Sequence, residues 1–355
     1  MKTDFFKNLK VIEIASVLAG PSVGLFFSEL GSDVIKIENK KTEGDVTRSW
    51  KLPSEDKNSN LSAYFCSVNW NKTHQFLNLT DATDLQIVKD LINEADIVIL
   101  NFKKGDDIKF KLGYDVLKKT NPKLIYGNIT GFGEESDRVA YDLILQAESG
   151  FMSMNGTSTS GPIKMPVALI DVLAGHQLKE GLLVALIERF ETGLGNKVSV
   201  SLYDSAIASL ANQATNWLME NHVAQPIGSI HPNICPYGEL FTTKDNHIIT
   251  FAIGSNKQFL NLCRSIGLDL LVKNELYSNN VNRVKNRKSL AVLISKKVED
   301  WNANELINSL HLKFVPVAKI NTIEDVFNDP KAQSLILEEQ INGVNTKRVK
   351  TVVFK

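Results

Sequence analysis

The stretch KVIEIASVLAGPSVGLFFSELGSDVIKIE (residues 10–38) decides the fold, because it has the pattern of a strand, a helix and a second strand. The apolar runs at 10–14 and 33–38 are typical of buried strands. The apolar residues between them recur at helical spacing: Val23, Phe26, Phe27 and Leu30. Gly31 follows, as expected at the end of a helix.

Strand-like runs continue through the first part of the chain, at 96–100, 123–129 and 197–202, with helical patterns between them. This alternation predicts an α/β fold, a Rossmann-like domain whose parallel sheet carries helices on both faces. Ligands of such sheets gather at the carboxyl ends of the strands. We expect both ASVLAGPS (15–22) and the turn at Asp171 to lie there.

The composition changes near residue 221, where turn residues mix with short β-like runs before further helical segments. We therefore expect a large domain over 1–220 and a smaller α+β domain over 221–325. The segment 326–355 should return to the large domain, because its last part, NGVNTKRVKTVVFK (342–355), has the pattern of a strand.

The charge balance argues against two classes of partner. Among 355 residues, 40 are Lys or Arg and 40 are Asp or Glu, which gives no electrostatic case for nucleic acid or an anionic membrane. No run approaches the ~18 apolar residues of a membrane span. The start MKTDFFKNLK is too polar for a signal peptide, and three scattered cysteines support neither a disulfide framework nor a zinc site. We expect a cytoplasmic protein without a metal.

Individual motifs leave the function open. GxGxxG, GxxxxGK[ST], HExxH and GxSxG do not occur in the sequence. Asp171, in PVALIDVLAGHQ (166–177), follows an apolar run and precedes a helical pattern. An aspartate in this position is either a helix N-cap or a catalytic carboxylate. Asp142 likewise lies near a helix start, and Gly254 in IGSNKQ (253–258) has the pattern of a turn glycine.

Taken together, the segments resemble the family III CoA-transferases, the CaiB/BaiF group that includes formyl-CoA transferase. The resemblance covers nearly the whole chain, in the expected order, through 9–50, 69–79, 95–102, 121–133, 141–156, 168–175 and 191–206 and then through HPNICPYGELFTT, IGSNKQF and VPVAKINTIEDVFNDP. It implies an enzyme that moves CoA from an acyl-CoA to a small carboxylic acid. Coenzyme A would be a substrate, with no permanently bound cofactor.

The resemblance also implies roles for individual residues. It places the catalytic nucleophile on Asp171, which would form an aspartyl anhydride and then an aspartyl-CoA thioester. Tyr141, Asp142 and Gly254 would complete the site, with Gly254 in a loop that closes over the aspartate. The implied CoA contacts are Val17, Leu18, Ala19, Leu77, Asn78, Leu79, Asn101, Phe102, Lys111 and Arg138.

Three departures from the family pattern keep alternatives open. Asn39 stands where relatives often carry arginine, so a phosphate or adenine contact is either lost or moved to Lys40 or Lys41. Tyr141 replaces the histidine of the related α-methylacyl-CoA racemases, which favours transfer over racemisation. The chain also lacks the family's usual C-terminal segment, which keeps a non-catalytic CoA-binding paralogue possible. Members of the family form interlocked homodimers, and we expect one here.

Overall fold

The computed structural model describes residues 4–354 and divides into two compact units. Unit 1 contains the chain up to Gly156, then Ser160–Pro226, and again the chain from Ser334 on. Unit 2 contains Thr157–Thr159 and Ile227–Gln333. We expected the boundaries at residues 220 and 325. The divisions observed fall after Pro226 and after Gln333, and the second lies later because the short helices α16 (Ile323–Phe327) and α17 (Pro330–Gln333) belong to unit 2.

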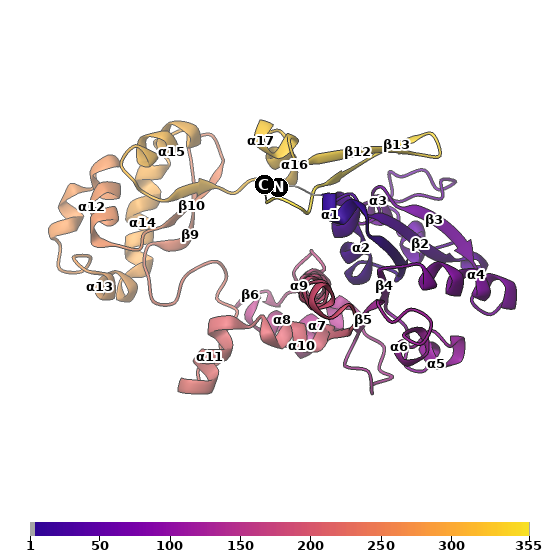
Figure 1. The fold of residues 1–355 in the computed structure, drawn as a ribbon. Coiled ribbons are helices and arrows are strands. Elements are labelled where there is room, and N and C mark those ends of the chain that lie inside the picture. The colour runs from indigo at the N-terminus through magenta and orange to yellow at the C-terminus, as the bar shows by residue number, and fades with distance from the viewer. Residues whose placement is uncertain (1–3, 355) are drawn as a thin grey trace. The chain divides into compact units, whose positions relative to one another are not determined.

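Unit 1 is built on a parallel sheet of six strands in the order β3-β2-β1-β4-β5-β8 (Figure 1). The strands are β1 (Lys10–Ile14), β2 (Asp33–Asn39), β3 (Thr73–Leu77), β4 (Ile97–Leu100), β5 (Ile125–Thr130) and β8 (Lys197–Ser201). The predicted α/β fold is confirmed. The strand order reverses between β1 and β4, so the carboxyl ends of these two strands form the switch point at which such sheets bind ligands.

Helices cover both faces of this sheet (Figure 1). One core joins Val11 of β1 to α2 and α9, and a second joins Ile12 of the same strand to α4. The helices of unit 1 are α1 (Asp4–Lys7), α2 (Ala19–Glu29), α3 (Ala63–Cys66), α4 (Ala82–Asn93), α5 (Asp106–Phe110), α6 (Tyr114–Leu117), α7 (Asp142–Glu148), α8 (Phe151–Met154), α9 (Leu169–Thr192), α10 (Leu202–Ala208) and α11 (Ala211–Glu220). Short strands β6 (Gly156–Thr157) and β7 (Gly161–Pro162) form a separate pair.

Unit 2 has its own sheet and its own core. Strands β9 (Tyr237–Thr242), β10 (Ile248–Ala252) and β11 (Val317–Lys319) form an antiparallel sheet in the order β11-β10-β9. Its longer helices are α12 (Asn256–Ser265), α13 (Asn280–Lys285), α14 (Arg287–Val298) and α15 (Ala303–His311). Phe251, Phe259 and Leu290 join sheet and helices in one buried cluster.

The chain returns to unit 1 as a hairpin of β12 (Ile336–Ile341) and β13 (Val344–Val349). Beyond it, the backbone N–H groups of Thr351 and Val352 donate to the carboxylate of Glu29 at the end of α2, at 2.9 and 2.7 Å. The strand expected in the last segment is thus β13.

We also expected no membrane-spanning segment, no metal site and no disulfide framework. Between residues 4 and 354, no helix is both long and apolar enough to cross a membrane. The same residues contain no cluster of His, Cys, Asp and Glu suited to a metal ion. Cys66, Cys235 and Cys263 are buried and unpaired with one another.

Candidate active site

Asp171 is the third residue of α9, and its side chain is only 7% exposed. The N-cap of α9 is Ala168, and no side chain caps the helix there. The interpretation of Asp171 as a helix N-cap is therefore wrong, because the helix begins two residues before it. The run 166–170 is not a strand either, so Asp171 does not follow a strand as we expected.

Asp142 lies beside it and stabilises the start of α9 from another helix. Asp142 is the first residue of α7, and its Oδ1 accepts a hydrogen bond from the backbone N–H of Ile170 at 2.8 Å. Its Oδ2 accepts from Nε2 of Gln146 at 2.6 Å. Gln146 in turn accepts from the backbone N–H of Met165 at 2.8 Å. Asp142 and Gln146 therefore fix the segment that leads into Asp171.

The electrostatics of this pair favour a reactive carboxylate. Burial, and secondly the charge of Asp142, raise the pKa of Asp171 from 3.8 to about 7. Neither cause is a hydrogen bond or a positive charge, so the carboxylate is poorly stabilised. A carboxylate of higher pKa is a better nucleophile, and near pH 7 much of it remains ionised. The environment of Asp171 therefore suits a carboxylate that acts as a nucleophile.

An aromatic pair lies close to the two carboxylates. Burial and then the charges of Asp171 and Asp142 raise the pKa of Tyr64 to about 12. The ring of Tyr64 meets that of Trp50 edge to face, with centroids 5.1 Å apart. Tyr141, the expected site residue next to Asp142, is 57% exposed at the N-cap of α7. Its phenol and the pair Trp50–Tyr64 are thus available to a ligand.

Close packing brings α9 to the first turn of the sheet. A Cβ on Gly175 would lie 2.4 Å from Oγ of Ser22 and 3.2 Å from the carbonyl oxygen of Ala19. Residues four apart share a helix face, so Asp171 is on the face of α9 that meets the start of α2. The expected CoA contacts Val17, Leu18 and Ala19 lie in this region, after β1.

Asn101 belongs to the same region but acts on the backbone. Its Oδ1 accepts from the N–H of Ser16 at 3.1 Å, and its Nδ2 donates to the carbonyl of Ser16 at 2.9 Å. The side chain therefore fixes the turn after β1. Phe102, the next residue, is half-buried against Phe110, with ring centroids 5.9 Å apart.

The remaining expected CoA contacts are more dispersed. Leu77 ends β3, Leu79 is half-buried, and Asn78 lines a surface hollow with Lys40 and Lys41. An adjoining hollow is lined by Lys40, Lys57 and the exposed ring of Phe76.

The two expected cations outside these hollows differ. Lys111 is exposed and has a positive φ of 55° at the end of α5. Arg138 is paired with Glu148 at 2.6 Å and lies over the ring of Phe132, so its charge is already engaged.

Gly254 belongs to unit 2, in the segment between β10 and α12. Its N–H donates to Oε1 of Gln258 at 3.0 Å, and Ser255 begins α12 with a capping box. Gly254 does not have a positive φ, and a Cβ there would meet only Oε1 of Gln258, at 3.7 Å. The conformation described does not itself require glycine.

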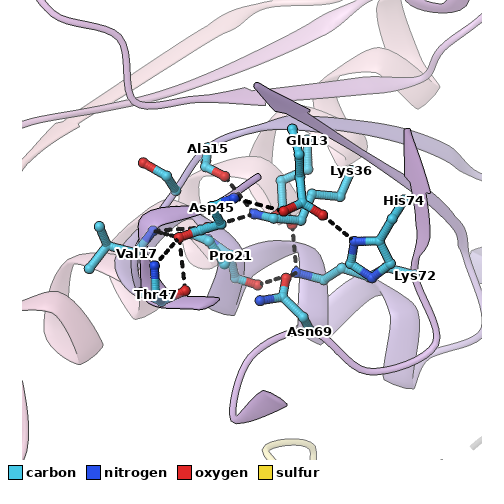
Figure 2. A network of polar contacts seen from close by, with 12 residues as sticks. Glu13, Ala15, Val17, Pro21, Lys36, Asp45, Thr47, Asn69, Lys72 and His74 are labelled. Atoms are coloured by element: carbon cyan, nitrogen blue, oxygen red, sulfur yellow. Dashed lines mark hydrogen bonds and ion pairs between the residues drawn. The ribbon is translucent and has the colours of Figure 1, made fainter. Parts of the chain in front are cut away.

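Sequence reasoning missed a buried ionic network next to the first turn (Figure 2). Nζ of Lys36 lies 2.8 Å from Glu13 and 3.2 Å from Asp45, and Nζ of Lys72 lies 2.8 Å from Glu13. None of these four residues is more than 7% exposed. A signal was present, because Glu13 and Lys36 are the fourth residues of KVIEI and DVIKI and pair directly in the parallel register.

The chain is similar to known proteins in sequence and in structure. A family model described as CoA-transferase family III matches residues 6–354. A CaiB/BaiF family protein from Brucella suis has a similar structure, with a TM-score of 0.88 and 35% identity, covering 99% of this chain and 92% of that one.

Two relatives of assigned activity are also similar in sequence. A succinate–glutarate CoA-transferase of Agrobacterium fabrum is 37% identical over 92% of this chain and 82% of its own length. The human succinyl-CoA:glutarate CoA-transferase is 32% identical over 94% of this chain and 76% of its own length.

Proposed function

The chain belongs to CoA-transferase family III, as the resemblance in its sequence indicated, and on that premise we propose that Asp171 carries CoA between two carboxylic acids. The observation that supports this role is the buried carboxylate of Asp171, whose pKa is raised to about 7. It is a nucleophile held at a helix start that Asp142 fixes.

The proposed reaction conserves the thioester in four steps. An oxygen of Asp171 attacks the acyl carbon of the donor and forms an anhydride, while the C–S bond breaks and CoA leaves as a thiolate. The thiolate attacks the aspartyl carbonyl, which forms an aspartyl-CoA thioester and releases the donor acid. The acceptor carboxylate displaces CoA in the same way, and the returning thiolate then attacks the acyl carbon and frees Asp171. Anhydrides hydrolyse, so the site must exclude water.

We further propose dicarboxylic acids as the substrate class, because the printed names of two relatives contain succinate or succinyl-CoA and glutarate. Incubating the protein with succinyl-CoA and a panel of acids, with mass spectrometry of the CoA products, tests both proposals. Glutaryl-CoA should form, and monocarboxylic acids should react more slowly. Exchange of the α-proton without CoA transfer would indicate a racemase instead. CoA binding with neither reaction would indicate a non-catalytic paralogue.

The reaction should depend on pH through Asp171. Only the ionised carboxylate attacks, so kcat/KM should fall about tenfold per pH unit below a pKa of about 7 and level off above it. Asp142→Asn removes one of the two causes of the raised pKa, so this acid limb should move to lower pH. Initial rates between about pH 5 and 9 measure it.

Glu148→Gln is the matched control for this shift, since it removes a charge from the same helix α7 at a carboxylate that pairs with Arg138 instead. It should leave the limb in place. If kcat/KM of the wild type does not change across neutral pH, or if the acid limb of Asp142→Asn moves to higher pH, the assignment of this limb to Asp171 is contradicted.

We propose that the hollows around Lys40 hold the phosphates of CoA, in place of the arginine that relatives carry near Asn39. The hollow with Lys40 and Lys57 has one acidic residue, Glu43, and the ring of Phe76 in it can stack on a base. The hollow with Lys40 and Lys41 also has Asp81 and Asp84, so the first has the excess of positive charge and suits a phosphate better. Lys40→Ala should raise KM for succinyl-CoA about tenfold with little change in kcat, because one charge–phosphate contact is worth about 1.4 kcal/mol. Lys119→Ala, an exposed lysine beyond α6, should change nothing.

The phosphates themselves provide the decisive comparison for this contact. A succinyl-pantetheine thioester lacks the nucleotide, so Lys40→Ala should not alter its KM. An equal rise in KM for both thioesters would contradict the assignment.

We also propose that the protein is a cytoplasmic homodimer. Large apolar side chains are exposed on α9 and α11, among them Phe190 at 80% and Leu218 at 79%, and burial by a second copy would stabilise them. Three unpaired cysteines suit a reducing compartment. Sedimentation equilibrium measures the oligomeric state, and a monomer at micromolar concentration would contradict the proposal.

A further inference from the structure

Three buried or half-buried side chains hold three consecutive residues of the turn after β1, and Figure 2 shows two of them, Lys36 and Asp45. Lys36 donates to the carbonyl of Ala15 at 2.6 Å. Asn101 brackets the backbone of Ser16, as described above. The carboxylate of Asp45 accepts from the backbone N–H of Val17 at 3.2 Å. The side chains come from β2, from the end of β4 and from the loop after β2, so the turn is fixed from several directions.

The middle of this turn has an unfavourable conformation. Val17 has a φ of 72°, in the left-handed region that a β-branched residue rarely adopts. Such conformations persist only where the surroundings enforce them, and they concentrate at functional sites. The N–H of Val17 donates to Asp45, so Asp45 is the side chain that contacts the strained residue itself.

Asp45 is itself rigidly held. It is 6% exposed, lies 3.2 Å from Nζ of Lys36, and accepts from the N–H and the hydroxyl of Thr47 at 3.0 and 2.8 Å. Its own N–H donates to Oε2 of Glu38 at 2.8 Å, and Glu38 forms a two-pronged pair with Arg48. These partners fix the position of the Asp45 carboxylate, so the backbone of Val17 that is bonded to it has little freedom to move.

The turn leads directly to the candidate active site. It ends where α2 begins at Ala19, and the carbonyl of Ala19 lies against Gly175, one helical turn beyond Asp171. Burial and, after it, the charges of Asp171, Asp142 and Asp45 raise the pKa of the phenol of Tyr64. Asp45 and Asp171 are therefore both close enough to Tyr64 to influence its phenol, although they belong to different elements.

We propose that Asp45 is a positioning residue of the transfer reaction: by holding Val17 in the left-handed conformation, it aligns the backbone of residues 16–18 with the acyl-CoA beside Asp171. The proposal rests on the proposed function and extends it to a residue with no direct role in the chemistry. Asp45 acts through Val17, while the ion pair with Nζ of Lys36 holds its carboxylate in place.

Two substitutions separate positioning from general stability. Asp45→Ala removes the acceptor for Val17 and should lower kcat/KM about 100-fold, since misplacement by about 1 Å costs this much. Asp45→Asn retains one oxygen acceptor and should cost less than about tenfold. Both lose the negative charge that faces Lys36, so their melting temperatures should fall by similar amounts. Activity should therefore fall strongly only in Asp45→Ala, which loses the hydrogen-bond acceptor. Stability should fall in both variants, because both lose the negative charge.

Val17→Gly supplies a second, independent comparison, because glycine adopts a positive φ without strain. The loss caused by Asp45→Ala should shrink to less than about fivefold when both are measured in the Val17→Gly background. Thr47→Val, which removes a different hydrogen bond to the same carboxylate, should change kcat/KM less than about threefold. If Asp45→Ala does not fold, Asp45→Asn in the two backgrounds decides the question.

The outcomes are distinct. If Asp45→Ala keeps wild-type activity, or costs as much in the Val17→Gly background, the positioning role is refuted while the proposed function stands. If the wild-type chain transfers no CoA, the proposed function fails instead. In that case calorimetry measures the CoA affinity of the same variants. Asp45→Ala should weaken CoA binding, and the weakening should be smaller in the Val17→Gly background.

Discussion

Asp171→Asn abolishes CoA transfer: we expect kcat to fall at least about 10⁴-fold, because the variant loses the oxygen nucleophile and no second carboxylate is placed to replace it. Asp142 lies next to it but is engaged with Ile170 and Gln146. Single-turnover mass spectrometry with succinyl-CoA measures the loss. Hydroxylamine or borohydride added during turnover should modify Asp171 in the wild type and leave the variant unlabelled.

The same substitution should stabilise the fold, which rules out misfolding as the cause of the loss. A folded-state pKa raised from 3.8 to about 7 means that wild-type stability falls as pH rises through this window and is lowest above it. At about pH 8 the variant should gain about 2–4 kcal/mol in free energy of unfolding, and the gain should vanish near pH 4. Residual transfer above about 1% of wild type would exclude Asp171 as the covalent carrier.

Glu13→Gln should destabilise unit 1 by about 3–5 kcal/mol, as expected when one partner of a buried ion pair is removed. Glu13 is fully buried and is the shared partner of Lys36 and Lys72, so the variant leaves two ammonium groups facing a neutral amide. A Cβ on Gly24 would lie 1.8 Å from Oε2 of Glu13, so α2 packs directly against this carboxylate. Urea unfolding followed by tryptophan fluorescence measures the loss.

The loss should be smaller in alkaline solution. Burial lowers the pKa of Lys72 from 10.5 to about 8 although Glu13 raises it, so Glu13→Gln should lower this pKa further. At high pH Lys72 of the folded variant loses its proton, which removes an unpaired buried charge and makes the stability of the variant rise with pH more steeply than that of the wild type. Asp115→Asn is the control, because it breaks an exposed pair with Lys118 and should leave the unfolding midpoint unchanged. Equal midpoints for Glu13→Gln and wild type would show that the network does not stabilise the fold.

Much of unit 1 could be predicted because its strands are short apolar runs that alternate with helical patterns. The predicted run 10–14 coincides with β1, and 33–38 lies within β2 (Asp33–Asn39). β3 (Thr73–Leu77) escaped notice, since THQFL is mostly polar and only half-buried at the sheet edge. Pairing with β2, which no local pattern reveals, makes it a strand.

The site was less accessible to sequence reasoning, for two physical reasons. Asp171 follows an apolar run that resembles a strand, yet Asp142 supplies the missing cap and lets α9 start at Leu169. That hydrogen bond joins residues 28 apart. The contact of Asp45 with Val17 likewise depends on tertiary structure, and the conformation of Val17 contradicts the preference of its own side chain.

The return of the hairpin β12–β13 to unit 1 has a consequence for how the protein is made. The carboxylate of Glu29 emerges early from the ribosome, but its partner Thr351 follows 322 residues later. At typical rates of synthesis this interval is on the order of tens of seconds. Nearly all of unit 2 is one continuous segment, so it can assemble its core in that interval. The six-stranded sheet of unit 1 must meanwhile persist without the hairpin β12–β13, which forms a separate two-stranded sheet.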